Sequence, residues 1–152
     1  MNPDHTLLLE FAAQPPGEPR AITTNPLAID LGATLIAADA QAGTLSLGFA
    51  PDARFVQGNG AVQGGIVAAM LDFATAFAVL LQLPPERSAV TAELNLQFMR
   101  AAKAGRFVAH ARVRRRGGKL AFAAADLVRA DDETNLIASA TATLPVLEIT
   151  SA

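Results

Sequence analysis

The sequence predicts an α+β protein in which one long helix packs against a single meandering antiparallel sheet. An almost continuous apolar run, Ile66–Leu83, indicates the helix, because it is rich in Ala, Leu and Met and stops at Pro84 and Pro85. Five segments of alternating or clustered apolar residues, bounded by turn residues, indicate the sheet. A helix and a sheet bury their apolar faces against each other, and this defines the fold class.

The N-terminal residues 1–22 are predicted to form an arm, and residues 23–152 the domain itself. Three prolines between residues 15 and 19 interrupt regular structure after one short helical turn around Leu7–Phe11. The chain is long enough for one domain with a real core, but it has no room for a second catalytic domain.

The first predicted strand begins at Gly43, where Leu45, Leu47 and Phe49 alternate with small or polar residues. A glycine-rich loop at residues 57–60 separates this strand from the long helix. The helix would be about 27 Å long at 1.5 Å per residue, which is long enough to cross a membrane. A carboxylate in its middle would be costly in lipid, so we expect the helix to be buried in protein.

Four further strands are predicted after the helix: Val90–Phe98, Phe107–Arg115, Leu120–Arg129 and Leu136–Leu147. The sequence Arg-Gly-Gly-Lys at residues 116–119 fits a tight hairpin turn, and the polar segment Asp131–Asn135 fits a longer one. Short connections of this kind join antiparallel neighbours in one sheet.

The composition excludes several classes of protein. Hydrophobic residues make up 51% of the chain and charged residues 17%, which is below the roughly 25% of ordinary soluble domains, so we expect apolar surface to be buried between subunits. The absence of cysteine excludes disulfides, thiolate metal sites and cysteine nucleophiles. A net charge of -2 argues against nucleic-acid binding. No secretory signal is recognisable, and we expect a cytoplasmic protein that does not bind membranes.

Asp72 is the only charged residue between Phe55 and Pro85, and it stands inside the most hydrophobic predicted helix. Burying an unpaired carboxylate costs several kcal/mol, so such a residue is usually hydrogen-bonded for structure or used in chemistry. The residues alone leave both interpretations open. If Asp72 is catalytic, it must stay ionised at neutral pH, and we expect hydrogen bonds or a helix N-terminus to compensate for its burial.

The pair Gly64–Gly65 lies at the predicted start of this helix. Unpaired backbone N–H groups and the positive end of the helix dipole meet at such a terminus, which can stabilise an oxyanion. The alternative is that the two glycines only permit a tight turn into the helix.

The histidines and basic residues are weaker indications of function than Asp72 and the glycine pair. His5 lies in the arm and His110 on a predicted strand, where we expect a surface or packed residue, so neither a serine–histidine triad nor a histidine metal site is supported. Arg100, Arg116 and Lys119 belong to a group of basic residues that would suit phosphate, although a solvated hairpin tip is the ordinary explanation.

The segment Gln57–Asp72 resembles hot-dog-fold thioesterases of the phenylacetyl-CoA and 4-hydroxybenzoyl-CoA thioesterase type. These proteins carry His-Gly-Gly before a long helix that contains a catalytic acid. Here the motif is Gln63-Gly64-Gly65, and Asp72 follows eight residues after the first glycine, as in the family. Residues 90–100 also resemble the family's strand after the helix, so the similarity extends over residues 43–147.

The resemblance implies the hot-dog fold, an antiparallel sheet wrapped around one long central helix, and hydrolysis of acyl-CoA thioesters without a cofactor other than the coenzyme A of the substrate. It implies that Asp72 is the nucleophile or general base and that the Gly64 amide polarises the thioester carbonyl. Gln57 would orient the carbonyl or the attacking water, and Thr91 would hold water near the acid. The site would lie at the interface of a homodimer or homotetramer.

Further residues are expected to contact the substrate: Asn59, Gln63, Gly65, Phe73, Ala76, Arg100, Arg116 and Lys119. The glutamine replaces the histidine of the motif. It keeps a hydrogen-bond donor and an acceptor but does not titrate near neutral pH.

Two other functions remain open at this point. A non-catalytic hot-dog module would bind acyl-CoA without turnover. A hot-dog hydratase would need a histidine paired with an acid, and neither histidine is placed for that role.

Overall fold

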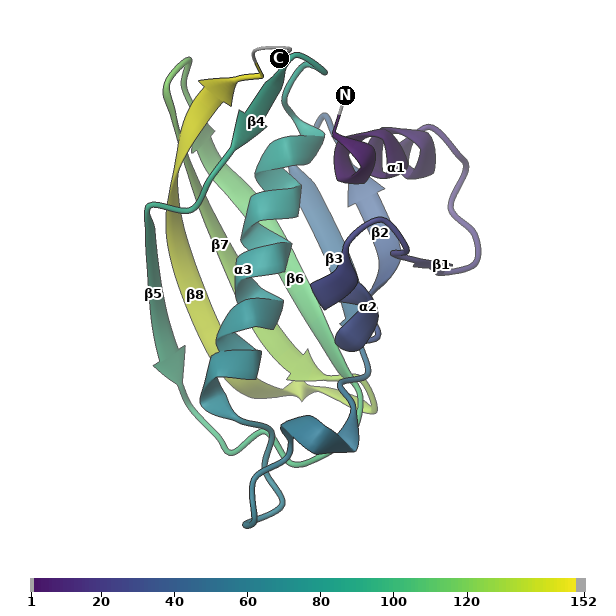
Figure 1. Cartoon of the computed structure of the whole chain (residues 1–152), viewed down its shortest axis with the longest axis vertical. Coiled ribbons are helices and arrows are strands. Elements are labelled where there is room, and N and C mark those ends of the chain that lie inside the picture. Colours follow the sequence, from purple (N-terminus) through teal and green to yellow (C-terminus); the bar gives the residue numbers. More distant parts are fainter. Residues whose placement is uncertain (1, 150–152) are drawn as a thin grey trace.

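The computed structural model describes residues 2–149, and over these residues eight strands form one antiparallel sheet. A long helix, α3 (Gly64–Leu81), lies across one face of the sheet (Figure 1). It contacts the central strands along its length, and its buried side chains include Met70, Leu71 and Ala74. The predicted fold class is confirmed.

Eight strands are numbered in chain order, and helix α3 lies between the third and the fourth in the sequence. Their bounds are β1 (Arg20–Ala21), β2 (Thr34–Asp39), β3 (Thr44–Phe49), β4 (Arg87–Ala89), β5 (Glu93–Phe98), β6 (Phe107–Arg116), β7 (Leu120–Arg129) and β8 (Asp132–Glu148). Their order in the sheet is β1-β2-β3-β6-β7-β8, and both β4 and β5 pair with the remaining side of β8.

The predicted strands agree with the structure except at two places. Strand β8 begins at Asp132, earlier than the predicted Leu136, because Asp132 pairs with Arg129 across a turn that is shorter than expected. The segment predicted as one strand, Val90–Phe98, consists of strand β5 and a link, residues 90–92, which joins the two short strands β4 and β5. These run one after the other along β8, and the ladder loosens at residues 90–92.

Helix α3 starts two residues before the prediction and ends at Leu81, before the two prolines. By length and composition it is apolar enough to cross a membrane, but here it is the core helix of the fold and 56% of it is buried. Its N-cap residue, Gln63, makes no side-chain cap hydrogen bond. The first turn of the helix therefore keeps backbone donors that its own cap does not satisfy.

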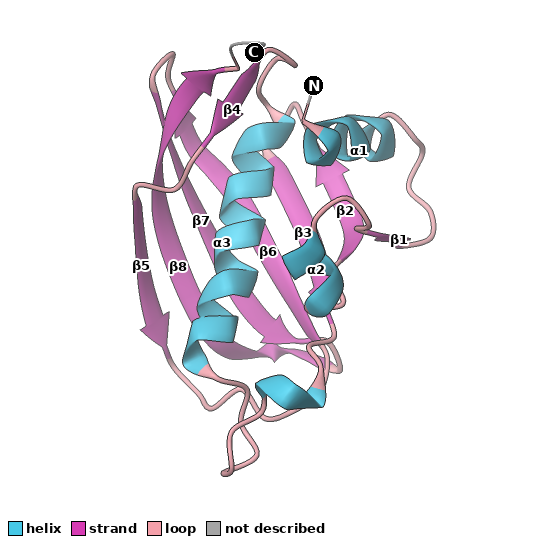
Figure 2. Ribbon diagram, in the orientation of Figure 1, coloured by secondary structure: helices cyan, strands magenta, loops and turns pink. Residues whose placement is uncertain are grey.

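The segment predicted as an arm contains a helix that belongs to the core. Helix α1 (Pro3–Ala12) is capped by Asn2 and buries Leu7 and Leu8 against α3 and β2. A second short helix, α2 (Pro26–Asp30), is capped by Asn25. Figure 2 shows α1 and α2 beside α3, at the side of the sheet formed by β1 and β2. The N-terminal segment thus extends the core past the edge of α3.

The outer face of the sheet carries polar side chains at its centre, where Ser46, His110, Asp126 and Ser139 occupy neighbouring positions on four strands. His110 is a surface residue of β6, and its ring nitrogens lie 2.8 Å from Ser46 Oγ and 3.2 Å from a carboxylate oxygen of Glu133. This group lies on the opposite side of the sheet from α3, on β3, β6 and the start of β8. It is a surface hydrogen-bond network and not part of the site below.

Candidate active site

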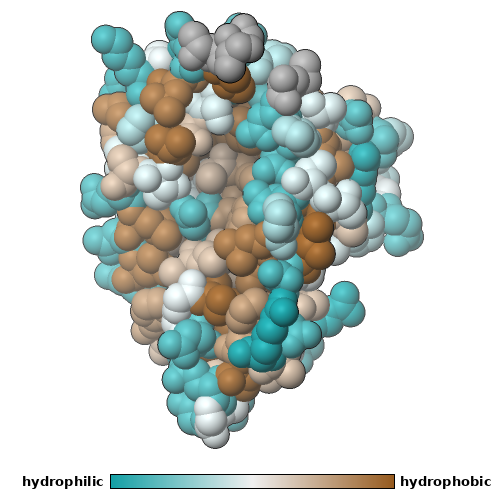
Figure 3. All heavy atoms as spheres, viewed as in Figure 1, coloured by the Kyte–Doolittle hydropathy of each residue, from teal (hydrophilic) through white to brown (hydrophobic). Residues whose placement is uncertain are grey.

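One face of α3 is not covered by any element of the described chain. Ile66, Ala69, Asp72, Phe73 and Ala76 are half-buried along it, whereas the opposite side of the helix is fully buried. Figure 3 shows apolar residues, in brown and tan, over this face of the molecule between more hydrophilic margins. Asp72 is thus a carboxylate on an otherwise apolar surface.

Asp72 accepts a hydrogen bond from Thr91. The distance from Thr91 Oγ1 to Asp72 Oδ1 is 2.7 Å. Thr91 lies in the break between β4 and β5, and this break turns its hydroxyl toward the helix. Asp72 is half-buried rather than fully buried in the single chain, which corrects the expectation from sequence. The hydrogen bond expected for this carboxylate is present.

The start of α3 presents free backbone donors. Within residues 2–149, the N–H groups of Gly64 and Gly65 have no hydrogen-bond acceptor. The approach to the helix is held by the amide of Gln63, which donates to the Phe55 carbonyl at 2.9 Å, and by that of Val62, which donates to Ala102 at 2.7 Å. A fixed helix N-terminus with unused donors can bind a developing negative charge.

A hollow of about 360 Å³ opens beside this helix start. It brings together four predicted site residues, Gln57, Asn59, Gly64 and Arg100, with the exposed ring of Phe98. The ring lies about 3.8 Å from the place where a Cβ on Gly64 would stand, so a side chain of one carbon would still fit there. The side-chain oxygen of Asn59 accepts from the Ala61 amide at 3.1 Å and shapes the loop.

The acid and the free amide do not meet within one chain. Asp72 follows Gly64 by eight residues on the same helix, which separates them by about 12 Å along the axis. Phe73 and Ala76 lie with Asp72, whereas Gln63 and Gly65 are exposed beside the free amide. The single chain therefore holds two separate halves of the predicted site.

Arg116 and Lys119 lie apart from both halves. Their hairpin touches β4, where Arg87 Nη1 donates to the Gly118 carbonyl at 2.9 Å. In Figure 1 this hairpin is at the top, near the C-terminal end of α3, whereas the N-terminal end of the helix, which begins at Gly64, is at the bottom. Within one chain, only Arg100 of the three predicted basic contacts lies at the glycine end.

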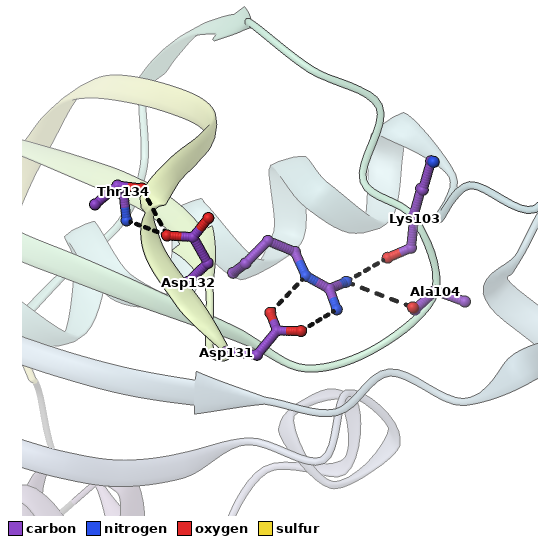
Figure 4. A network of polar contacts seen from close by, with 6 residues as sticks. Lys103, Ala104, Asp131, Asp132 and Thr134 are labelled. Atoms are coloured by element: carbon purple, nitrogen blue, oxygen red, sulfur yellow. Dashed lines mark hydrogen bonds and ion pairs between the residues drawn. The ribbon is translucent and has the colours of Figure 1, made fainter.

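The glycine end also contains a hydrogen-bonded ion pair between Arg129 and Asp131, which the sequence analysis did not predict. Arg129 donates to both carboxylate oxygens of Asp131, at 3.0 and 3.3 Å, and to the carbonyl of Lys103 at 2.8 Å (Figure 4). The bond to Arg129 lowers the pKa of the Asp131 carboxyl below its ordinary value. Gly105 permits this arrangement, because its φ is +149° and a Cβ there would stand 2.7 Å from the guanidinium.

A second hollow, of about 490 Å³, is lined in part by Arg129 and shares Arg100 and Ala101 with the first hollow. Asn135 lines it, and the Oδ1 atom of Asn135 is buried without a hydrogen-bond partner in the described chain. In the sequence Asn135 is only the last residue of a polar turn, and nothing in its neighbourhood marks it as a site residue.

The fold and the paired features on α3 define a class of protein, the hot-dog thioesterases. A protein related to phenylacetic acid degradation from Ralstonia eutropha JMP134 has the same fold with a TM-score of 0.77. It is 33% identical, and the match covers 93% of this chain and 98% of that one. A thioesterase family protein from Silicibacter pomeroyi is 30% identical over 82% of this chain and 90% of its own, with a TM-score of 0.75.

The thioesterase superfamily model matches residues 59–135, about half of the chain, including Asp72 and Thr91. The chain therefore belongs to the thioesterase superfamily, and its general activity is thioester hydrolysis. The PaaI protein of the E. coli phenylacetic acid degradation operon shares the fold, with a TM-score of 0.71 at 22% identity over 84% of this chain and 87% of its own. No sequence among curated proteins matches significantly.

Proposed function

We propose that this protein hydrolyses acyl-CoA thioesters as a homodimer, at two sites that each combine Asp72 of one subunit with the Gly64 amide of the other. The observation that supports this most directly is the half-buried Asp72 carboxylate, held by Thr91 on a helix face that the chain leaves uncovered. A hydrogen-bonded acid on an apolar surface is suited to chemistry once a second surface closes over it.

The separation along α3 argues for two subunits. The two groups lie about 12 Å apart on one helix, which is too far for both to act on one carbonyl. A two-fold axis near Ala68, midway between Gly64 and Asp72, would place two α3 helices side by side and antiparallel. Each Asp72 would then face the Gly64 of the other subunit. Alanines and glycine on the uncovered face permit a close approach of the two helices.

The free edge of the sheet supports the same arrangement. Within residues 2–149, β5 pairs only with β8, so its other side has unpaired backbone groups. Val90, directly after β4, and Phe98, the last residue of β5, are 50% and 57% exposed. An open strand edge flanked by exposed apolar side chains is a natural place for a second copy of the chain to pair.

In the proposed reaction, the Asp72 carboxylate takes a proton from a water molecule as the water oxygen bonds to the thioester carbonyl carbon. The carbonyl oxygen becomes an oxyanion, which the partner's Gly64 N–H and the helix dipole stabilise. The carbon–sulfur bond then breaks, the thiolate leaves, and the proton returns to sulfur or to solvent. The products are the free acid and coenzyme A.

A second route uses the same residues. The Asp72 carboxylate attacks the carbonyl carbon directly, the thiolate leaves, and water opens the resulting anhydride. Phe73 and Ala76 lie next to Asp72 on the apolar face in either case, where they would contact the acyl group. Gln57, in the hollow beside Gly64, would orient the carbonyl or the water.

The test is thiol release from a panel of short, long and aryl acyl-CoAs by the wild type and by Asp72→Asn, which keeps the side-chain shape but removes the charge. We expect kcat/KM to fall by about 100-fold or more in the variant, with acyl-CoA binding retained. Binding without turnover in the wild type would favour the non-catalytic acyl-CoA module. Equal turnover in both proteins would exclude Asp72 as the catalytic acid.

A further inference from the structure

Three side chains on the outer face of the sheet form a chain of hydrogen bonds that starts at a hydroxyl. Ser46 Oγ lies 2.8 Å from His110 Nδ1, and His110 Nε2 lies 3.2 Å from a carboxylate oxygen of Glu133. A carboxylate only accepts hydrogen bonds, so in the neutral ring Nε2 carries the proton and Nδ1 is the acceptor of the Ser46 hydroxyl. One tautomer of the imidazole thus satisfies both contacts.

This order of groups is that of an activated nucleophile: a hydroxyl, an imidazole base, and a carboxylate that orients the base. Ser46 and His110 are paired neighbours on β3 and β6, which fixes the first contact. Asp126, opposite His110 on β7, takes no part, because both ring nitrogens are already engaged and its own carboxylate accepts from the Ser139 hydroxyl at 2.5 Å. The chain alone does not indicate the group, because Ser46 and His110 lie 64 positions apart.

A guanidinium stands beside the hydroxyl. The next pair on the same face of β3 and β6 is Thr44 and Arg112, so Arg112 is a diagonal neighbour of Ser46, within reach of a long side chain. Arg112 makes no ion pair among residues 2–149. Strand β3 is paired on both sides, so the sheet uses its amides. Arg112 is therefore the donor that can meet an oxyanion formed at Ser46.

A hollow of about 540 Å³ begins on the other side of Ser46 and His110. The pair next to them in that direction is Gly48 and Val108, and both line the hollow together with Ile36 of β2. The wall nearest to the hydroxyl is thus apolar. Two residues along a strand span about 7 Å, which is within the reach of an ester with a short acyl chain.

The geometry points to a second catalytic centre on this outer face, a serine esterase site with Ser46 as the nucleophile, His110 as the general base and Glu133 as the positioning residue for His110. Its substrates are uncharged carboxylic esters of phenols, and their apolar part lies in the hollow. The site goes beyond the proposed thioester hydrolysis, since it uses no residue of α3 and needs no second subunit.

In the reaction, Ser46 Oγ bonds to the ester carbonyl carbon while its proton passes to His110 Nδ1. The carbonyl oxygen becomes an oxyanion beside Arg112. The carbonyl then re-forms, the bond from carbon to the phenol oxygen breaks, and the phenolate takes the proton from Nδ1. Water attacks the acylated serine in the same way, which releases the acid and restores the hydroxyl. A phenolate leaves readily, so the site needs only one cation to stabilise the oxyanion.

The first test is labelling with diisopropyl fluorophosphate, whose phosphorus bonds to an activated serine oxygen with loss of fluoride. Peptide mass spectrometry should find the adduct on Ser46. His110→Gln removes the base and should slow labelling by about 100-fold, and Ser46→Ala should abolish it. Ser139→Ala removes a hydroxyl on the same face that has no imidazole beside it, and it should label as the wild type does. No adduct on Ser46, or equal labelling of His110→Gln, would overturn the proposal.

The second test is hydrolysis of p-nitrophenyl butyrate in the Asp72→Asn variant, where the site on α3 is disabled. Adding Ser46→Ala should lower the rate by about 100-fold, and this result would hold whether or not the wild type hydrolyses acyl-CoA. Glu133→Gln should lower kcat by about tenfold and leave KM unchanged, which a merely structural role would not produce. If Ser46→Ala does not change the rate, the second centre is wrong, and thioester hydrolysis by the wild type is unaffected by that result.

Discussion

At the scale of single residues, the hydrogen bond from Thr91 to Asp72 is the interaction that positions the proposed catalytic acid. The hydroxyl donates to one carboxylate oxygen at 2.7 Å and so holds the carboxylate in place on the uncovered face of the helix. Thr75, one turn further along α3, donates instead to the carbonyls of Leu71 and Asp72, so it supports the backbone and leaves the carboxylate to Thr91.

Replacing Thr91 should therefore reduce catalysis without unfolding the protein. Thr91→Val keeps the shape but removes the donor, and we expect kcat/KM to fall by about tenfold, the effect of one exposed hydrogen bond to a charged group. Thr91→Ser keeps the donor and should retain most of the activity. Steady-state kinetics of both variants measures this. A Thr91→Ser variant as poor as Thr91→Val would mean that the methyl group, and not the hydroxyl, matters.

At the scale of elements, α1 brings an ionisable group into the core. The His5 side chain is completely buried, and neither ring nitrogen has a well-formed hydrogen bond within the described chain. Burial lowers the pKa of the imidazole below its ordinary value near 6.5, and the nearby Leu83 backbone offsets this only in part. The helix therefore docks with a neutral histidine.

The stability of the protein should depend on pH through this residue. The unfolded chain binds a proton to His5 near pH 6.5 and the folded chain only at lower pH, so acidification favours unfolding. The contribution is present above pH 6.5 and is lost as the pH falls through the lowered folded-state value. Urea unfolding between pH 7.5 and 5 measures the free energy of unfolding as a function of pH. In His5→Leu this free energy should depend less steeply on pH than in the wild type. An unchanged slope in the variant would place the dependence elsewhere.

The elements that could be predicted from the sequence are those with long, regular patterns. Helix α3 and strands β3, β6 and β7 have continuous or alternating apolar residues bounded by prolines or turn residues. Strand β2 was missed because a bulge between Leu35 and Ala37 breaks its alternation. Helices α1 and α2 are short, and packing against the core stabilises them more than their own propensities do.

The site was predictable only in part for related reasons. Asp72 stands out as an isolated charge in an apolar run, and the glycine pair marks the helix start. The contact from Thr91 depends on the break between β4 and β5, which no local pattern in this segment indicates. Asn135 faces its hollow because β8 begins early and places it in a strand beside residues 100–104.

At the scale of the whole molecule, the proposed division of the site between two subunits can be tested with two variants that should each be inactive. Asp72→Asn lacks the acid. Gly64→Pro lacks only the amide donor, because proline is accepted at the first position of a helix and Gln63, with ψ of 136°, already has the conformation that precedes proline. Gly64→Ala restores the N–H and is the matched control.

Dimers that contain one copy of each variant should recover activity. With two different affinity tags, the mixed dimer can be purified, and we expect about half of the wild-type kcat per dimer, because one of its two sites has both an intact acid and an intact amide. Each variant alone should stay inactive, and Gly64→Ala should stay active. A mixed dimer with no activity would mean that acid and amide act within the same subunit.

The open edge of β5 has a consequence for how the enzyme behaves at low concentration. If the second subunit both closes the sheet and completes the site, subunit association and catalysis share one equilibrium. Specific activity would then fall on dilution as subunits separate, and recover on concentration. Substrate that binds across the two subunits would oppose this loss, so saturating acyl-CoA should protect a dilute sample.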